Sequence, residues 1–182
     1  MKANSIVGLI RRSFSYLNPK LFQILYKSFV RPHLEYAGSV WSPKLRKLIN
    51  LIERVQRRAT RLVDGYSHLP YQDRLKKLDL PSLEFRRLMS DMVEVYKHIH
   101  VYDPLTIPNK LIRKTRPSRK HNYELQPNFA ADGHRGPQTK SLYYRCITIW
   151  NSLPREVVNA NSVKAFKDSL KKAWANHPLR YG

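Results

Sequence analysis

The side chains in this sequence that are best suited to binding chemistry are five cations gathered within residues 42–65. A guanidinium group donates hydrogen bonds in a fixed fork that matches the oxygens of a phosphate, and an ammonium group adds a compact positive charge. Side chains of this kind hold a nucleic-acid backbone without reading its bases. The candidate binding residues are therefore Lys47, Arg54, Arg57, Arg58 and Arg61.

Side chains that could carry out a reaction do not form any familiar pattern. The sequence has no HExxH motif, no CxxC pair, no glycine-rich phosphate loop and no local signature of a Ser–His–Asp triad. Residues 71–74, Tyr-Gln-Asp-Arg, superficially resemble a polymerase aspartate box, but two-metal phosphoryl chemistry needs adjacent carboxylates and this segment has one acid. His98 and His100 are poorly spaced for a metal pair on a helix. We therefore predict a binding module that is not an enzyme on its own and uses no metal or cofactor.

An amphipathic helix over residues 42–65 is predicted to present the five cations. Ser42 and Pro43 suit its N-cap and first helical position, and Gly65 suits the residue after its end. The polar face contains one acid, Glu53, whereas a solvated face usually mixes both signs. The opposite face has the spacing of a helix docked on a core and contains Leu45, Leu48, Ile49, Ile52, Val55, Ala59 and Leu62.

The overall charge indicates what such a face would meet. The chain of 182 residues has a formal net charge of +21 at pH 7 and 42% hydrophobic residues, so it combines a packed core with strong self-repulsion. This balance is typical of proteins with a polyanionic partner, most commonly nucleic acid and next an anionic membrane. For the basic face, an acidic partner protein is the alternative. No apolar run approaches the roughly 18 to 20 residues of a membrane span, so we expect no membrane partner.

The single cysteine, Cys146, gives no disulfide framework and favours a reducing compartment. Its apolar neighbours predict a small core residue rather than a nucleophile. The N-terminal stretch has too short and too interrupted an apolar run for a secretion signal. We therefore expect an intracellular protein, nuclear or cytoplasmic, with the nucleus favoured.

Helical patterns precede the basic stretch. Residues 2–15 predict a first helix, and Asn18 suits the cap of a second. Because Pro32 lacks an N–H group, we expect the second helix to end or kink near Arg31, with further helix over residues 33–41. Three or four helices with short joints can close as a small bundle.

Helical patterns return after the basic stretch, with one interruption. Residues 71–78 and 82–99 predict helices, and Ser162 suits the cap of a last helix. Residues 101–140 are rich in proline and in cations, which predicts an irregular basic segment. The predicted fold class is thus mainly α, with a helical bundle over residues 1–66, a helical extension over 67–100, an irregular basic linker over 101–140 and a C-terminal helical segment over 141–182.

Several motifs together give the sequence a family resemblance. The first, YKSFVRPHLEYA at residues 26–37, is followed by VWSP at 40–43 and IERVQRRATR at 52–61. The later ones are LKKL at 75–78, LPSLEFRR at 80–87, WNSLP at 150–154, Val157, Val158, Ala160, Phe166 and Lys167. In this order they resemble the C-terminal region of non-LTR retrotransposon reverse transcriptases of the jockey and chicken-repeat type.

The resemblance implies a polymerase thumb and the segment after it, which follow the palm in such elements. A thumb of this family is a helical bundle that holds the template–product duplex by its backbone, and the matching motif assigns that role to the Arg54–Arg61 face. No position matches the paired aspartates of the palm or the endonuclease, so polymerase activity does not carry over.

The expected function is therefore that of a fragment of an RNA-directed DNA polymerase that binds an RNA–DNA or DNA duplex. A further partner implied by the resemblance is the palm or another retrotransposon protein. Two alternatives stay open on sequence alone: an interaction module that docks on a larger protein, and a repurposed nucleic-acid-binding protein.

Overall fold

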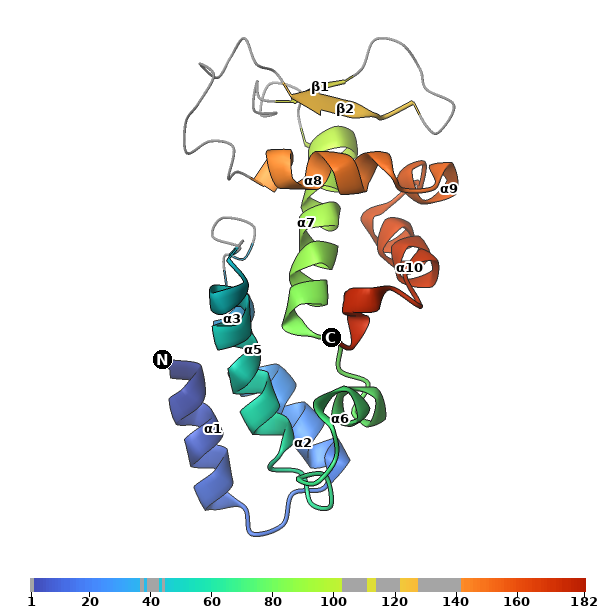
Figure 1. Ribbon diagram of the computed structural model, residues 1–182. Helices are drawn as coiled ribbons and strands as arrows, with labels where there is room; N and C mark the ends of the chain where they lie inside the picture. Colours follow the sequence, from blue (N-terminus) through green and yellow to red (C-terminus); the bar gives the residue numbers. More distant parts are fainter. Residues whose placement is uncertain are drawn as a thin grey trace. The chain divides into compact units, whose positions relative to one another are not determined.

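The computed structural model describes residues 2–36, 38, 43, 45–102, 111–113, 122–127 and 142–182 (Figure 1). Helices make up most of this described part, which confirms the predicted mainly α fold. Two short strands, β1 (Leu111–Arg113) and β2 (Leu125–Pro127), pair antiparallel. Both fall in the predicted irregular linker, most of which lies outside the described residues. Across the described residues, no helix is both long and apolar enough to cross a membrane.

The chain forms two compact units whose boundaries differ from those of the four predicted segments. Unit 1 comprises Met1–Arg87 together with His177–Gly182, and unit 2 comprises Leu88–Asn176. The division falls inside one helix, α7 (Leu83–His100). Packing explains the difference, because the apolar side chains of residues 75–83 join the core of the N-terminal helices.

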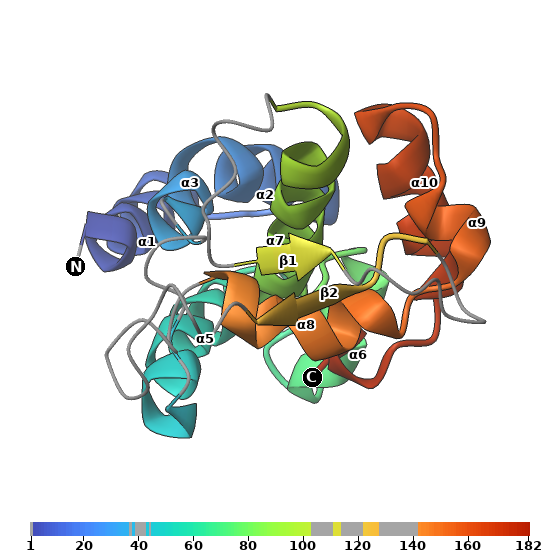
Figure 2. The same cartoon turned by 90° about the horizontal axis from the view of Figure 1, so that it is seen from above.

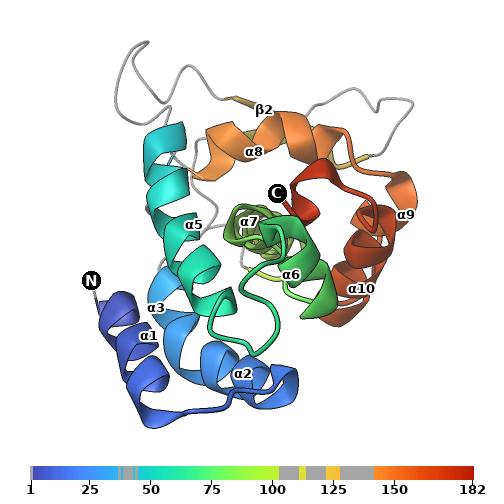
Figure 3. The ribbon, with the colours of Figure 1, turned by 60° about the horizontal axis from the view of Figure 1, so that its bottom comes forward.

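Unit 1 is a bundle of short helices around one apolar core, with α1 lying beside α5 (Figure 3). Besides the first residues of α7, its elements are α1 (Lys2–Ser13), α2 (Pro19–Leu25), the π-helical turn η1 (Tyr26–Val30), α3 (Pro32–Glu35), α5 (Arg46–Thr60), α6 (Tyr71–Lys77) and the 3-10 turn η4 (Pro178–Arg180). Its fully buried side chains include Val7, Phe22, Tyr26, Val30, Leu34, Leu75 and Leu78.

The chain from α2 to α3 stays helical but changes type on the way. Asn18 caps α2 as predicted, since its side chain accepts a hydrogen bond from the Leu21 N–H at 2.9 Å. In η1 the N–H of Arg31 donates to the carbonyl of Tyr26 at 2.9 Å, so the predicted break near Arg31 takes the form of a π-helical turn before α3. The predicted helix over residues 33–41 is helical to Glu35, and four of its later residues lie outside the described part.

Helix α5 is shorter than the helix predicted over residues 42–65. It is preceded by Leu45 in extended conformation and followed by Arg61 at its C-cap, so Pro43 is not its first helical residue, and Ser42 lies outside the described part. Leu45, which was predicted to lie on the apolar face of this helix, is instead 67% exposed. Gly65 occupies a turn beyond the helix with φ 75°, a conformation that glycine adopts without strain.

Unit 2 packs its helices around Trp150 and Phe166, and its β ribbon lies over α8 (Figure 2). Ser162 caps the last helix as predicted, accepting from the Ala165 N–H at 3.1 Å. Cys146 is 1% exposed, which confirms its prediction as a core residue. Besides α7 and the two strands, the elements of unit 2 are α8 (Leu142–Asn151), α9 (Arg155–Val158) and α10 (Val163–Ala173).

Candidate nucleic-acid interface

The five cations singled out in the sequence lie along α5 and its C-cap, and all five side chains are exposed. The structure gives none of the four residues Lys47, Arg54, Arg58 and Arg61 a side-chain partner among the residues it describes. They follow one another along the helix, because its rise of about 1.5 Å per residue separates Arg54 from Arg58 by about 6 Å and Arg58 from Arg61 by about 4.5 Å. Such a row can meet several phosphates of one backbone.

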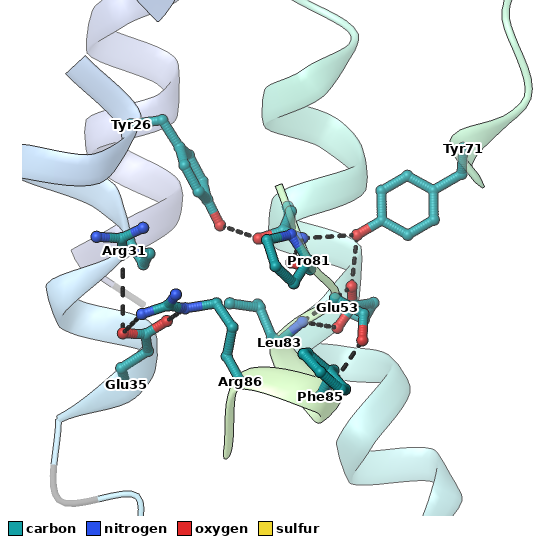
Figure 4. A network of polar contacts seen from close by, with 11 residues as sticks. Tyr26, Arg31, Glu35, Glu53, Tyr71, Pro81, Leu83, Phe85 and Arg86 are labelled. Carbon is teal, nitrogen blue, oxygen red and sulfur yellow. Dashed lines mark hydrogen bonds and ion pairs between the residues drawn. The ribbon is translucent and has the colours of Figure 1, made fainter. Parts of the chain in front are cut away.

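The one acid of α5 does not face solvent with the cations. Glu53 is 6% exposed, and its carboxylate accepts hydrogen bonds from the Tyr71 hydroxyl and, at 3.1 Å, from the Leu83 N–H at the start of α7 (Figure 4). Burial raises the pKa of the Glu53 carboxyl, and the hydrogen bonds from Tyr71 and Leu83 oppose this rise. The sequence-based assignment of Glu53 to the polar face is therefore wrong, and no acid lies on the exposed face of α5.

A buried polar chain continues from Glu53 along the inner side of α5. The Gln56 amide donates to the Tyr71 hydroxyl oxygen and to the Pro81 carbonyl, both at 3.1 Å. Its carbonyl oxygen accepts from the Tyr26 hydroxyl (Figure 4). Burial raises the pKa of both tyrosines, so their hydroxyls stay protonated and can donate. These directional contacts tie α5 to η1, to α6 and to the turn before α7, which fixes the rotation of α5 about its axis.

Arg57 differs from the other candidate residues because an aromatic ring holds it. Its guanidinium carbon lies 4.7 Å from the centroid of the Tyr71 ring, within the range of a cation–π contact. Arg74 lies 5.6 Å from the same centroid and is 2% exposed. Tyr71 thus connects the basic face to the buried polar chain.

Arg74 stabilises the C-terminal end of α5. Its Nε donates to the Thr60 hydroxyl at 3.1 Å, and one of its terminal nitrogens donates to the Leu69 carbonyl at 2.8 Å. Burial lowers the pKa of this guanidinium, yet its ordinary value is high enough that it remains charged at neutral pH. Arg74 is therefore a structural cation and is not part of the exposed face.

At the other end of α5, Arg46 forms an exposed ion pair with Glu84 at 2.8 Å. An exposed pair of this kind contributes little to stability but removes one cation from the positive face. Neither Arg46 nor Arg74 is therefore added to the candidate set.

The exposed cations of α5 are suited to binding anions. No group of three His, Cys, Asp or Glu side chains that could bind a metal occurs in the part of the chain that the structure describes. Burial raises the pKa of the Cys146 thiol to about 12, which keeps it protonated and poorly nucleophilic. The rejected aspartate-box segment lies on α6, where Tyr71 and Arg74 have the structural roles described above.

Sequence reasoning missed Glu53, Gln56 and Thr60 as inward-facing residues, although a signal for them exists. The three are spaced by three and four positions, as residues on one face of a helix are, and they border the apolar arc that contains Ile52 and Val55. Glu53 was assigned to the polar face because of its charge, and Gln56 and Thr60 were not assigned to either face. Tyr71 could not be found in this way, because its contact with α5 comes from tertiary structure.

Comparison with known proteins gives one partial match and no family. No family model matches the chain, and no solved structure matches it. A protein of Caenorhabditis elegans described as uncharacterized protein B0403.1 is 30% identical over 91 residues, which are 48% of this chain and 46% of that protein. The chain thus matches about half the length of this relative.

Proposed function

We propose that the chain is the thumb-like part of a non-LTR retrotransposon reverse transcriptase and that it binds a nucleic-acid duplex by its backbone, without a catalytic centre of its own. The observation that supports the proposal is the basic exposed face of α5, from which the one acid of this helix, Glu53, is withdrawn into the core. The sequence motifs within residues 26–43 and 52–61 support the proposed family, because they resemble motifs of these reverse transcriptases. Partners are an RNA–DNA or DNA duplex and, in the parent polymerase, the palm. The nucleus is the favoured compartment.

Backbone recognition explains the choice of residues. Exposed arginines on a helix meet phosphates at fixed spacing, and such contacts position a duplex without reading its sequence. Each phosphate neutralised releases condensed counterions, so the logarithm of the affinity falls linearly with the logarithm of the salt concentration. The proposal therefore predicts binding that depends strongly on salt and little on sequence.

A charge-reversal experiment tests this proposal. Fluorescence anisotropy would follow binding of a labelled RNA–DNA hybrid by wild type and by Arg54→Glu/Arg58→Glu/Arg61→Glu, between about 50 and 200 mM salt. Loss of three phosphate contacts should lower the salt slope by about three units and weaken binding at least about a hundredfold at low salt.

The matched control is the triple variant Lys167→Glu/Lys171→Glu/Lys172→Glu on α10, because these lysines are also exposed and the change in net charge is the same. Circular dichroism would verify that both variants keep their helices. If the two triple variants lose equal affinity, the hybrid responds to net charge and the assignment of the site to α5 is refuted.

A second candidate function is that of an interaction module docked on a larger protein. The observation that favours it is the exposure of large apolar side chains in unit 1, among them Ile24 at 62% and Tyr36 at 82%. Poor solubility of the isolated chain would support this function, whereas a soluble monomer with cooperative melting would count against it. The flanking genomic sequence gives a separate test, because an upstream reading frame with an aspartate pair would exclude a repurposed cellular protein.

A further inference from the structure

The π-helical turn η1 has a consequence for the whole helical stretch from α2 to α3. Four buried side chains recur at every fourth position, namely Phe22, Tyr26, Val30 and Leu34. In an uninterrupted α-helix a spacing of four residues drifts by about 40° at each step, or about 120° over this row. A π-helical turn has more residues per turn and takes up the drift, so all four side chains reach the core.

The same π-helical turn also changes the directions of the exposed side chains on the solvent side of the stretch from α2 to α3. The side chains of Ile24 and Phe29 are five residues apart and would diverge by about 140° on an α-helix. Across the π-helical turn they lie on the solvent side together, 62% and 57% exposed. Pro32 and Tyr36 continue this side toward and beyond α3, and Tyr36 is 82% exposed. The exposed apolar side chains of this stretch, with the exposed Ser28 among them, are called here the apolar stripe, defined as Ile24, Phe29, Pro32 and Tyr36.

Cations border the stripe. Lys20 is exposed at its N-terminal end, and Lys27 and Arg31 follow along the next row of the helix. Lys27 donates to the Gln23 side chain at 2.9 Å. The acid of this row, Glu35, lies 3.9 Å from Arg31 and also accepts from Arg86 in a two-pronged ion pair (Figure 4). Because two arginines share this one carboxylate, the border presents net positive charge.

From this alignment we infer that the apolar stripe is a docking site for an acidic amphipathic helix of a partner protein, separate from the basic face of α5. Apolar side chains of the partner, spaced three and four residues apart, would cover Ile24 and Phe29, and its carboxylates would meet Lys20 and Lys27. A second copy of this chain does not fit, because a net charge of +21 on each copy opposes self-association. The inference does not depend on nucleic-acid binding.

Designed peptides test the inference on the full chain. One labelled peptide is an amphipathic helix with a leucine stripe flanked by glutamates, and a second has the same composition in scrambled order. Fluorescence anisotropy at physiological salt should show the first peptide binding at least about tenfold more tightly than the second. Ile24→Ser/Phe29→Ser should remove this preference. The matched control, Leu9→Ser/Tyr16→Ser, changes two other exposed apolar residues of unit 1, 55% and 67% exposed, and should keep it.

A charge swap completes the test. Lys20→Glu/Lys27→Glu should weaken the glutamate-flanked peptide and favour a lysine-flanked peptide with the same leucines. Equal binding of the ordered and scrambled peptides, or no binding of either, overturns the inference.

Two further outcomes also overturn it by identifying another occupant. One is a dimer in light scattering that Ile24→Ser/Phe29→Ser abolishes. The other is binding to vesicles of phosphatidylcholine and phosphatidylserine that the same variant abolishes. The substituted side chains are exposed except Lys27, which is half-buried, so circular dichroism and melting temperature would verify that each variant stays folded.

Discussion

Helices α5 and α10 have similar exposed faces but different buried faces. Each has an exposed face rich in cations and an inner face that packs on the core of its own unit. The fully buried side chains of α10, Phe166 and Leu170, are apolar, whereas α5 buries Glu53 and Gln56 among its apolar residues. Both kinds of packing position a helix, and hydrogen bonds with defined directions restrict its rotation further. Of these two helices, α5 therefore has the additional restraint that would suit the row of phosphate contacts proposed for it.

The largest loss of stability is expected for a substitution in the apolar core beneath α10. Phe166→Ala removes a fully buried ring that packs against Trp150 and Tyr96, and it should lower the free energy of unfolding of unit 2 by about 3–5 kcal/mol. Urea denaturation followed by tryptophan fluorescence would measure it. A loss below about 1 kcal/mol would show that the core of unit 2 is loosely packed and would weaken the contrast with α5.

An intermediate effect is expected for the hydroxyl of Tyr71. Tyr71→Phe removes its hydrogen bonds with Glu53 and Gln56 but keeps the ring beneath Arg57. Because Glu53 and Gln56 would then each lack one hydrogen-bond partner, the free energy of unfolding should fall by about 1–3 kcal/mol. Faster amide hydrogen exchange in α5 would show this loss. The affinity of the folded protein for the RNA–DNA hybrid should stay near the wild-type value.

The control for Tyr71→Phe is Tyr66→Phe, since the Tyr66 ring also lies near a cation, 5.6 Å from the Lys77 ammonium, in the same unit. If Tyr71→Phe and Tyr66→Phe speed up amide hydrogen exchange in α5 equally, the buried polar chain does not orient the helix.

The smallest and most specific effect is the pH dependence that Glu53 contributes. Because burial raises the pKa of its carboxyl, the folded protein keeps this proton to a higher pH than the unfolded chain does. Between the unfolded and the folded pKa the folded state binds more protons, so stability falls as the pH rises through that window. Glu53→Gln removes the titration.

The measurement is the difference in free energy of unfolding between wild type and Glu53→Gln, from mildly acidic to neutral pH. Other titrating groups cancel in this difference, which should fall with increasing pH. A difference that rises with pH would show that the hydrogen bonds from Tyr71 and Leu83 outweigh burial and hold the pKa of Glu53 below its ordinary value.

Local periodicity predicted the helices well and their contacts poorly. The mainly α class, the caps at Asn18 and Ser162 and the burial of Cys146 all follow from short-range patterns and are confirmed. The π-helical turn was missed because a stripe that repeats every four residues differs only slightly from one that repeats every 3.6.

Features that depend on distant parts of the chain could not be predicted. The spacing of Glu53 could have indicated its inward position, but its hydrogen-bond partners Tyr71 and Leu83 are brought to it by the tertiary fold. The exposed position of Leu45 arises because the core ends before α5 does, and a helical wheel does not contain that information. The candidate cations themselves were predictable in identity, while the polar chain that orients them was not.

The membership of His177–Gly182 in unit 1 has a consequence for the timing of folding. The Ser82 N–H donates to the Arg180 carbonyl at 2.8 Å, and the Ser82 hydroxyl donates to the Leu179 carbonyl. A ribosome adding about 5–20 residues per second needs roughly 4–18 s to make residues 88–176, which separate these partners. During this interval the start of α7 lacks its final contacts, so unit 1 completes its fold only after unit 2 has been synthesised.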